Sequence, residues 1–187
     1  MELVDALAGT TIGATYNQYA GSALLRERLR EYLADREDAE LLLVGEAAGY
    51  RGARVSGIPF TSERQLTGTG PAEASATIVH RVLDGLGIAA HTLLWNVVPT
   101  HPGTESSNRR PTRVEIEASR PFLEQLAARR TVVAVGRIAS EALDVPYIRH
   151  PAHGGAQAFA EGVREALAGV RFRYNPRPAD ASSASFL

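Results

Sequence analysis

The sequence predicts a single α/β domain with a central four-stranded parallel sheet and helices on both faces. Short apolar runs of strand length alternate with amphipathic helical segments along the chain, which is typical of such sheets. The length of 187 residues suits one domain with a sizeable core. We expect the domain to cover residues 1–170 and a Pro-, Ser- and Ala-rich extension to cover residues 171–187.

Four segments have the composition of buried strands. The first is the apolar run at residues 41–44, which Gly45 ends, so that Glu46 is the first polar side chain beyond it. Because the carboxyl ends of parallel strands share one edge of a sheet, polar residues that follow the strands should meet there. Asn96 stands near the end of a second strand, and His150 follows the fourth. The other three strands are expected at residues 91–98, 131–135 and 145–149.

Amphipathic helices are predicted around these strands from apolar residues at helical spacing. Gly87 is expected to cap one helix, and Pro121 to split or kink another. Residues 99–112 form a long polar segment with no secondary structure of its own, and such loops are usually functional or disordered. The helices are expected at residues 22–34, 75–86, 113–130, 137–143 and 157–167.

Two residue types are missing from the sequence. The absence of cysteine excludes disulfides, cysteine nucleophiles and iron–sulfur clusters held by thiolates. The absence of lysine makes all 20 basic residues arginine, which excludes a side-chain Schiff base. A net charge of -1 means that any nucleic-acid contact depends on local arginines. No apolar run is long enough for a signal or membrane segment, so a soluble, cytoplasmic protein is expected.

The segment after the first strand has the features of a ligand site. Gly49, Gly52 and Gly57 allow the backbone to approach a ligand closely, and the segment ends in the loop aromatic Phe60. A generic turn that binds a phosphate or nucleotide would account for this segment alone, because short glycine motifs are weak signals.

Three motifs in order resemble the uracil-DNA glycosylase superfamily. GEAAGYRGARVSGIPF is similar to the first motif of its iron–sulfur branches, which read GEAPG followed by G-x-PF. NVVPTHPGTESSNRRPTRVEIEASRPFL looks like the family's asparagine strand, arginine/proline loop and helix, and RHPAHGGA resembles its second catalytic motif. The resemblance runs over residues 41–167. It implies the family's fold and a monofunctional uracil-DNA glycosylase that acts in base excision repair.

The resemblance also implies a role for each residue at the sheet edge. Glu46 and His150 would be catalytic: Glu46 would position or deprotonate the attacking water, and His150 would donate a hydrogen bond to the uracil oxygen that gains charge. Phe60 would stack on the flipped base, and Asn96 would read its imide edge. Tyr50 would exclude a thymine methyl group by size. The expected base site is completed by Gly45 and Ala47.

The implied partner is uracil-containing DNA, bound by a monomer without a membrane, an iron–sulfur cluster, a metal or another cofactor. A metal site built from His150 and His153 with His101 or His91 is less favoured, because no cysteine or carboxylate stands at ligand spacing. Contacts to the DNA backbone are expected from Arg109, Arg110, Arg113, His153 and Gly154.

Each of these residues is also compatible with a purely structural role. Phe60 fits a core position, Asn96 a strand cap, and His150 a structural histidine, while the arginine loop fits a solvated loop. Ala47 and Ala48 stand where related branches carry Asp or Asn and a proline, so a backbone carbonyl is an alternative holder of the water. The competing functions are removal of hypoxanthine or xanthine, non-catalytic nucleic-acid binding, and small-nucleotide hydrolysis or binding.

Overall fold

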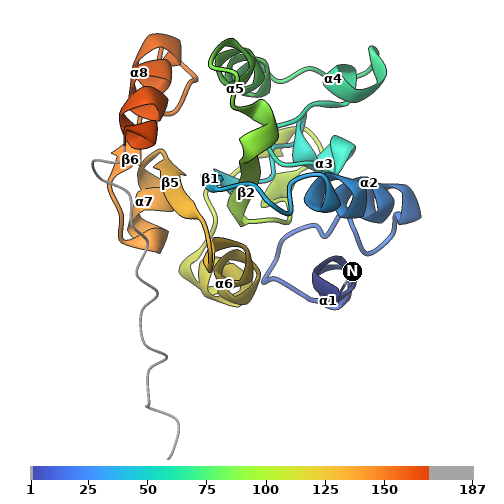
Figure 1. The fold of residues 1–187 in the computed structure, drawn as a ribbon. Coiled ribbons are helices and arrows are strands. Elements are labelled where there is room, and N and C mark those ends of the chain that lie inside the picture. Colours follow the sequence, from blue (N-terminus) through green and yellow to red (C-terminus); the bar gives the residue numbers. More distant parts are fainter. Residues whose placement is uncertain (1, 169–187) are drawn as a thin grey trace, which may run out of the picture.

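Four parallel strands form the central sheet of the computed structural model, which describes residues 2–168 (Figure 1). The order across the sheet is β2 (Thr92–Val98), β1 (Leu41–Ala47), β5 (Thr131–Val135) and β6 (Tyr147–Ile148). The register pairs Gly45 of β1 with Asn96 of β2, which sets the two residues side by side near the carboxyl edge. The predicted four-stranded parallel sheet is therefore confirmed. The proposed extension at residues 171–187 lies outside the described residues.

Helices cover both faces of the sheet, as predicted. Alternate residues of β1 point to opposite faces: Leu42 and Val44 join one buried cluster, while Leu41 and Leu43 join the other. Burial on both faces explains why the strands read as continuous apolar runs. The first face carries α1 (Glu2–Gly9), α2 (Ala23–Ala34), α6 (Arg113–Ala127) and α7 (Arg137–Leu143), and the second carries α5 (Ala74–Gly85) and α8 (Ala156–Leu167) (Figure 1).

Helix boundaries follow local capping chemistry. The Ser22 side chain accepts a hydrogen bond from the N–H of Leu25 and starts α2, and Thr112 with Glu115 forms a capping box at the start of α6. α6 continues through Pro121 as one helix of 15 residues, so the proline does not split it. Phe122, which follows the proline, is buried in the core and holds this part of α6 against the sheet.

Two strand boundaries differ from the prediction. β1 continues to Ala47, so Glu46 lies within the last part of the strand and not beyond it. Glycine did not end the strand because Gly45 and Ala47 both pair with β2. β6 is shorter than predicted and contains two residues. Pro146, directly before it, has no N–H to donate to a neighbouring strand.

The segment after β2 is not structureless. It forms a small antiparallel hairpin of β3 (Gly103–Thr104) and β4 (Ser107–Asn108). Gly103 has φ of 140°, a conformation that favours glycine, and the Thr104 and Ser107 hydroxyls lie 2.7 Å apart across the hairpin. Sequence patterns also missed four short elements: α1, α3 (Ala53–Ser56), α4 (Glu63–Thr67) and the 3₁₀ helix η1 (Ala89–His91).

Candidate active site

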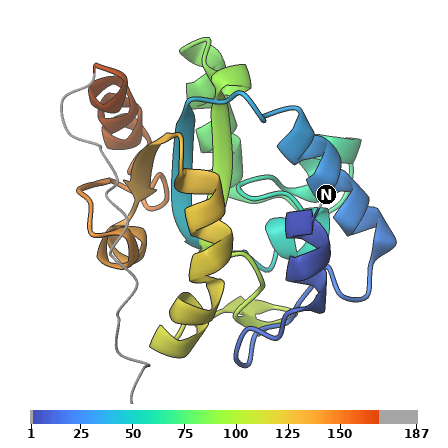
Figure 2. The same ribbon diagram turned by 60° about the horizontal axis from the view of Figure 1, so that its bottom comes forward.

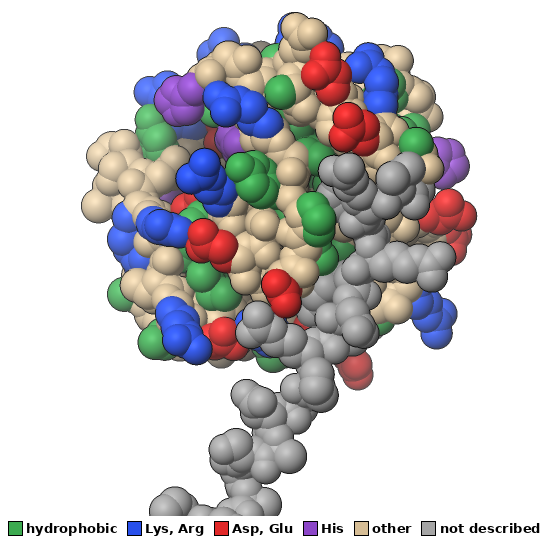
Figure 3. Space-filling model, turned by 90° about the vertical axis from the view of Figure 1, so that its left-hand side faces the viewer, with side chains coloured by type: hydrophobic (Ala, Val, Ile, Leu, Met, Phe, Trp, Pro, Cys, Tyr) green, Lys and Arg blue, Asp and Glu red, His purple; other side chains and the backbone are tan. Residues whose placement is uncertain are grey.

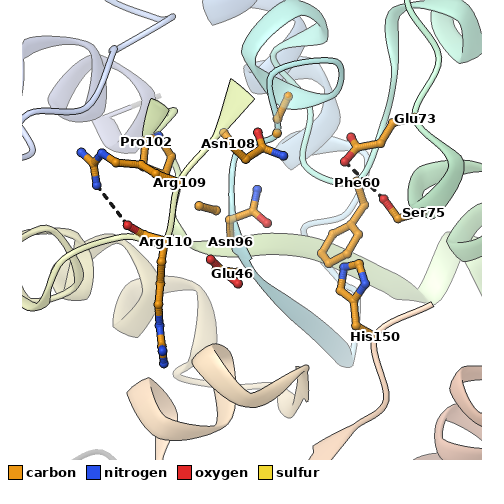
Figure 4. Close-up of a pocket in the computed structure, with 14 residues that line it drawn as sticks. Glu46, Phe60, Glu73, Ser75, Asn96, Pro102, Asn108, Arg109, Arg110 and His150 are labelled. Carbon is orange, nitrogen blue, oxygen red and sulfur yellow. Dashed lines mark hydrogen bonds between the residues drawn. The ribbon is translucent and has the colours of Figure 1, made fainter. Parts of the chain in front are cut away.

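A cavity of about 330 Å³ opens at the carboxyl edge of the sheet, a size within the usual range for ligand pockets (Figure 4). It brings together Glu46, Asn96 and His150, the three polar residues that the sequence placed at this edge. The lining residues are Glu46, Ala47, Ala48, Gly49, Ala53, Phe60, Glu73, Ser75, Asn96, Pro102, Asn108, Arg109, Arg110 and His150.

The base of the cavity requires a glycine at position 45. A Cβ atom on Gly45 would lie 2.8 Å from Cε2 of Phe60 and 3.0 Å from Oδ1 of Asn96. Both distances are shorter than ordinary Cβ contacts, so any other residue would displace the ring or the amide. Gly45 therefore leaves room for the Phe60 ring and the Asn96 amide, although its own atoms do not line the cavity.

Phe60 lines the cavity and also packs in the core, so the core interpretation holds, while stacking on a flipped base stays a prediction. Its backbone has φ of 52°, a left-handed conformation that residues with side chains rarely adopt. Buried hydrogen bonds hold this turn: Ser56 Oγ donates to the Thr61 carbonyl at 2.6 Å, and the Tyr19 hydroxyl donates to the Gly57 carbonyl at 2.9 Å. The ring is thus fixed in place before any ligand enters.

Asn96 is 4% exposed, yet its side-chain amide has no hydrogen-bond partner among residues 2–168. Buried polar groups in folded proteins are nearly always hydrogen-bonded, to protein or to water. The alternative of a strand-capping asparagine requires a backbone partner, which the amide does not have in the described part of the chain. Its donor and acceptor are therefore available to a molecule in the cavity.

His150 is oriented by its own loop. The backbone N–H of Ala152 donates to Nδ1 of His150 at 3.2 Å, so Nδ1 is the acceptor and the proton of the neutral ring sits on Nε2. Burial lowers the pKa of His150, and the charge of His153 lowers it further. Both effects favour a neutral imidazole that donates through Nε2.

Glu46 is a half-buried carboxyl group on the wall of the cavity. Burial raises its pKa, and the positive charge of Arg110 partly opposes that shift. No side-chain hydrogen bond from residues 2–168 occupies its oxygens. Its acceptor sites are therefore open to water or ligand.

The glycine turn after β1 is held from the hairpin side. Nδ1 of the buried His101 lies 2.7 Å from the Ala48 carbonyl, and Nε2 lies 2.8 Å from the Thr104 carbonyl. Oδ1 of Asn108 accepts from the Tyr50 N–H at 2.9 Å. A carbonyl oxygen has two acceptor sites, so the Ala48 carbonyl and Glu46 both stay candidates for holding the water.

The ring of Tyr50 does not lie on the cavity wall. It packs against the guanidinium of Arg51, whose Cζ is 5.3 Å from the ring centroid. Only the Tyr50 N–H contributes to the turn that borders the cavity. Exclusion of thymine by the Tyr50 ring accordingly stays a prediction.

Glu73 is a cavity residue that the sequence did not reveal. Its carboxylate packs against the backbone of Gly49 and Gly52, and a Cβ on Gly49 would lie 2.8 Å from Glu73 Oε1. Ser75 Oγ donates to Oε1 at 3.2 Å, and burial raises the pKa of Glu73. The two glycines signalled that another group comes close to this turn, but no pattern could identify the group.

Arg109 is held by the protein itself. Its Nη1 donates to Oε2 of Glu115 at 2.8 Å, and Glu115 is 1% exposed. The N–H groups of Thr112 and Ala14 also donate to Glu115. The hydrogen bond from Arg109 is the largest reason why the pKa of Glu115 falls to about 2. The expected phosphate contact of Arg109 stays a prediction.

The other expected DNA-backbone residues lie near the cavity. Arg110 is 66% exposed, and its Nη2 lies 3.2 Å from Oε2 of Glu141, which is equally exposed. Arg113 is exposed in the first turn of α6, and the exposed residues His153 and Gly154 form the turn after His150, both with positive φ. This placement suits phosphate contacts, which remain predictions.

Charged side chains of both signs are interspersed over the face of the molecule that carries α7 and α8 (Figure 3). Within residues 2–168, no group of three His, Cys, Asp or Glu side chains could hold a metal ion. In the same part of the chain, no helix has both the length and the apolar composition needed to cross a membrane.

Comparisons with known proteins agree with this geometry. The family model of the uracil DNA glycosylase superfamily matches residues 32–181. The fold is similar to the crystal structure of wild-type SMUG2 from Pedobacter heparinus, with a TM-score of 0.65, 13% sequence identity, and coverage of 89% of this chain and 97% of that chain. At this identity the likeness concerns the fold alone. No curated protein sequence matches the chain.

Proposed function

The chain belongs to the uracil DNA glycosylase superfamily, and we propose that it is a monofunctional DNA glycosylase that hydrolyses the N-glycosidic bond of uracil in base excision repair. The observation that carries the proposal is the Asn96 amide, which is 4% exposed, faces the cavity and has no partner within residues 2–168. An amide presents one donor edge and one acceptor edge, which complement the N–H and carbonyl of the uracil imide.

The rigid Phe60 ring supports the recognition of a flipped base. A base buried in a duplex must leave the stack before an enzyme can reach its glycosidic bond. Phe60 is held by a hydrogen-bonded turn on the wall that it shares with Asn96, so its face can replace the lost stacking while the amide reads the edge. Rigid placement reduces the ordering cost of binding.

The neutral His150 suits stabilisation of the leaving base. When the bond between C1′ and the base breaks, the bonding electrons leave with uracil, and negative charge develops on its carbonyl oxygens. His150 lines the cavity and its Nδ1 is held by the Ala152 N–H, so its Nε2–H is available to donate to such an oxygen. Donation from a neutral ring requires no proton uptake beforehand.

Glu46 suits the activation of water. Its free carboxylate accepts a hydrogen bond from water, directs the water oxygen to C1′ and takes the proton as the new C–O bond forms. The same negative charge stabilises the oxocarbenium-like sugar. Its raised pKa makes the carboxylate a stronger base than an exposed glutamate. The uracil anion then takes up a proton from solvent and Glu46 releases the proton that it took, so that the products are free uracil and an intact abasic strand.

The absence of lysine supports the monofunctional assignment. Cleavage of the abasic strand through an imine needs an amine, and arginine remains protonated. The N-terminal amine is the exception in this sequence. We further propose that the protein acts as a monomer in the cytoplasm without a cofactor; the absence of cysteine excludes a thiolate-bound iron–sulfur cluster.

The test uses a fluorescent oligonucleotide with one uracil, incubated with the protein and then heated in alkali. We expect strand cleavage only after the alkali step, and none with a thymine oligonucleotide of the same sequence. Borohydride added during the reaction should trap no protein–DNA adduct once the N-terminal amine is blocked. Release of hypoxanthine or xanthine, but not of uracil, from matched oligonucleotides would assign the protein to another deaminated base. Binding without release of any of these bases would identify a non-catalytic member of the superfamily, and either outcome would overturn the proposal.

A further inference from the structure

An exposed tyrosine with an arginine stacked on it lies beside the cavity. Tyr16 is 53% exposed, and Cζ of Arg54 lies 5.0 Å from the centre of its ring. The Arg54 side chain is only 16% exposed, and its Nη2 lies 3.1 Å from Oε1 of Glu105. Arg54 is therefore held against the ring and does not extend into solvent as a phosphate-binding side chain would.

Backbone bonds place this pair at the edge of the sheet that bears the cavity. Tyr16 and His101 form an antiparallel bridge, in which each N–H donates to the other carbonyl at 2.9 Å. Pro102 follows His101 and Ala53 precedes Arg54 in the chain, and both line the cavity. Figure 2 shows the loop after α1 running alongside the β3–β4 hairpin. The partner of Tyr16 in the bridge, His101, and the arginine stacked on its ring, Arg54, are thus each next in sequence to a residue that lines the cavity.

The chemistry of the pair fits a nucleobase better than a phosphate. Bases stack on tyrosine rings and on planar arginine groups whatever their sequence. Glu105, which is 91% exposed, offsets the charge of Arg54 and weakens attraction for a phosphate. A single exposed tyrosine is ordinary on a protein surface. This one is distinguished by its fixed arginine and its place at the rim.

We propose that Tyr16 and Arg54 form a stacking platform for an unpaired base adjacent to the flipped nucleotide, so that Tyr16 strengthens the binding of single-stranded DNA more than that of duplex DNA. A base within a duplex is already stacked on its neighbours and has no free face to offer. The inference deepens the proposed function, because it takes DNA as the ligand of the cavity.

The experiment compares wild type with Tyr16→Ala, Tyr16→Phe and Tyr16→Leu on uracil-free DNA, single-stranded and duplex. Tyr147→Ala is the matched control, because Tyr147 is 44% exposed and contacts Arg137 through its hydroxyl, but lies on β6 and does not line the cavity. We expect Tyr16→Ala and Tyr16→Leu to weaken single-strand binding about 5-fold or more, the effect of one lost stacked base. Duplex binding should change less, and Tyr16→Phe should bind as wild type does.

A second measurement locates the contact. Oligonucleotides carry fluorescent 2-aminopurine next to an abasic analogue on either side, and stacking quenches its emission. Wild type should quench one of the two positions, and Tyr16→Leu should not. Equal binding and quenching by wild type and Tyr16→Leu would overturn the platform, even with normal uracil release. Failure of uracil release with Tyr16-dependent binding intact would overturn the proposed reaction and leave the platform standing.

Discussion

Two groups of polar residues at the same edge of the sheet differ in how their hydrogen bonds are satisfied. The pocket group consists of Glu46, Asn96 and His150. Among these three side chains, only His150 has a hydrogen bond from the described residues, which its Nδ1 accepts from the Ala152 N–H. The α6 cap consists of Arg109, Thr112 and Glu115, where Glu115 accepts from the Arg109 side chain and from the backbone N–H groups of Thr112 and Ala14. One group is left open to a ligand and the other is closed by the protein.

This difference shows which polar residues are open to a ligand and which stabilise the fold, although the two kinds look alike in sequence. The polar side chains of the pocket group line the cavity, so a ligand with a complementary edge can bond to them there. The buried Glu115 carboxylate of the cap already accepts hydrogen bonds from Arg109, Thr112 and Ala14, so it is closed to a ligand. Arg109 and Arg110 are neighbours in the chain, yet Arg109 serves the cap while Arg110 reaches an exposed partner.

The largest expected effect is on the cap. Arg109→Ala removes the charged partner of a carboxylate that is 1% exposed. Because Arg109 is itself 36% exposed and the Thr112 and Ala14 N–H groups still donate to Glu115, we expect a loss of about 1.5–3 kcal/mol in the free energy of unfolding. Arg110→Ala is the control, since its ion pair is exposed and should contribute less than about 1 kcal/mol. Urea unfolding at pH 7 measures both. Similar losses for the two variants would show that the cap is not closed as described.

The cap also predicts how acid affects stability. The pKa of Glu115 is lowered to about 2 in the folded protein, against about 4.3 for an unfolded glutamate. Its stabilising contribution is therefore present above pH of about 4 and is lost as pH falls towards 2. In Arg109→Ala the main cause of the low pKa is gone, so less stability is lost over that interval. Parallel acid profiles for the two proteins would contradict this assignment.

The next effect is on the pocket group. Asn96→Asp, His150→Ala and Glu46→Gln should each lower single-turnover uracil excision by about 10²-fold or more, the scale of a lost electrostatic or general-base group. None should lower stability as Arg109→Ala does. Asn96→Asp should also release some cytosine, whose edge presents a donor where uracil has an acceptor. If the excision rate of Glu46→Gln equals that of wild type, another group holds the attacking water.

A smaller effect concerns DNA affinity. Each phosphate contact steepens the salt dependence of binding by about 0.7–0.9 log units, so Arg110→Ala with Arg113→Ala should flatten the slope by about one to two units. Uracil selectivity should hardly change, because these side chains position DNA without reading bases. The measurement is binding to uracil-free DNA at several salt concentrations. Slopes equal to that of wild type would place the phosphate contacts on other residues.

The smallest effect is a shift in the pH profile of excision. The rate should rise with pH as Glu46 loses its proton, with a midpoint above that of an ordinary glutamate because burial raises the pKa. Arg110 opposes this shift, so Arg110→Ala should move the midpoint to higher pH, whereas Arg113→Ala should leave it in place. If the midpoint of the pH profile is the same in Arg110→Ala as in wild type, the group that titrates is not Glu46.

The sequence by itself determined the fold class and the edge at which the cavity forms. Continuous apolar runs indicated strands buried on both faces, and their parallel order brought Glu46, Asn96 and His150 to one edge. These features depend on local periodicity and on the direction of the chain, which a sequence displays directly. Even the error at Gly45 was small, because one residue more or less of strand leaves Glu46 on the same wall.

Only the tertiary structure decided which polar groups are used by the protein and which are left open. Ala14 and Glu115 are 101 positions apart, and Tyr16 meets Arg54 only because the loop after α1 pairs with His101. No periodicity encodes such partners, since hydrogen bonds and ring contacts act over a few ångströms between segments that the fold brings together. For the same reason the sequence could not distinguish Arg109, which pairs with Glu115, from its neighbour Arg110. Nor could it predict that Glu73 contacts Gly49 and Gly52.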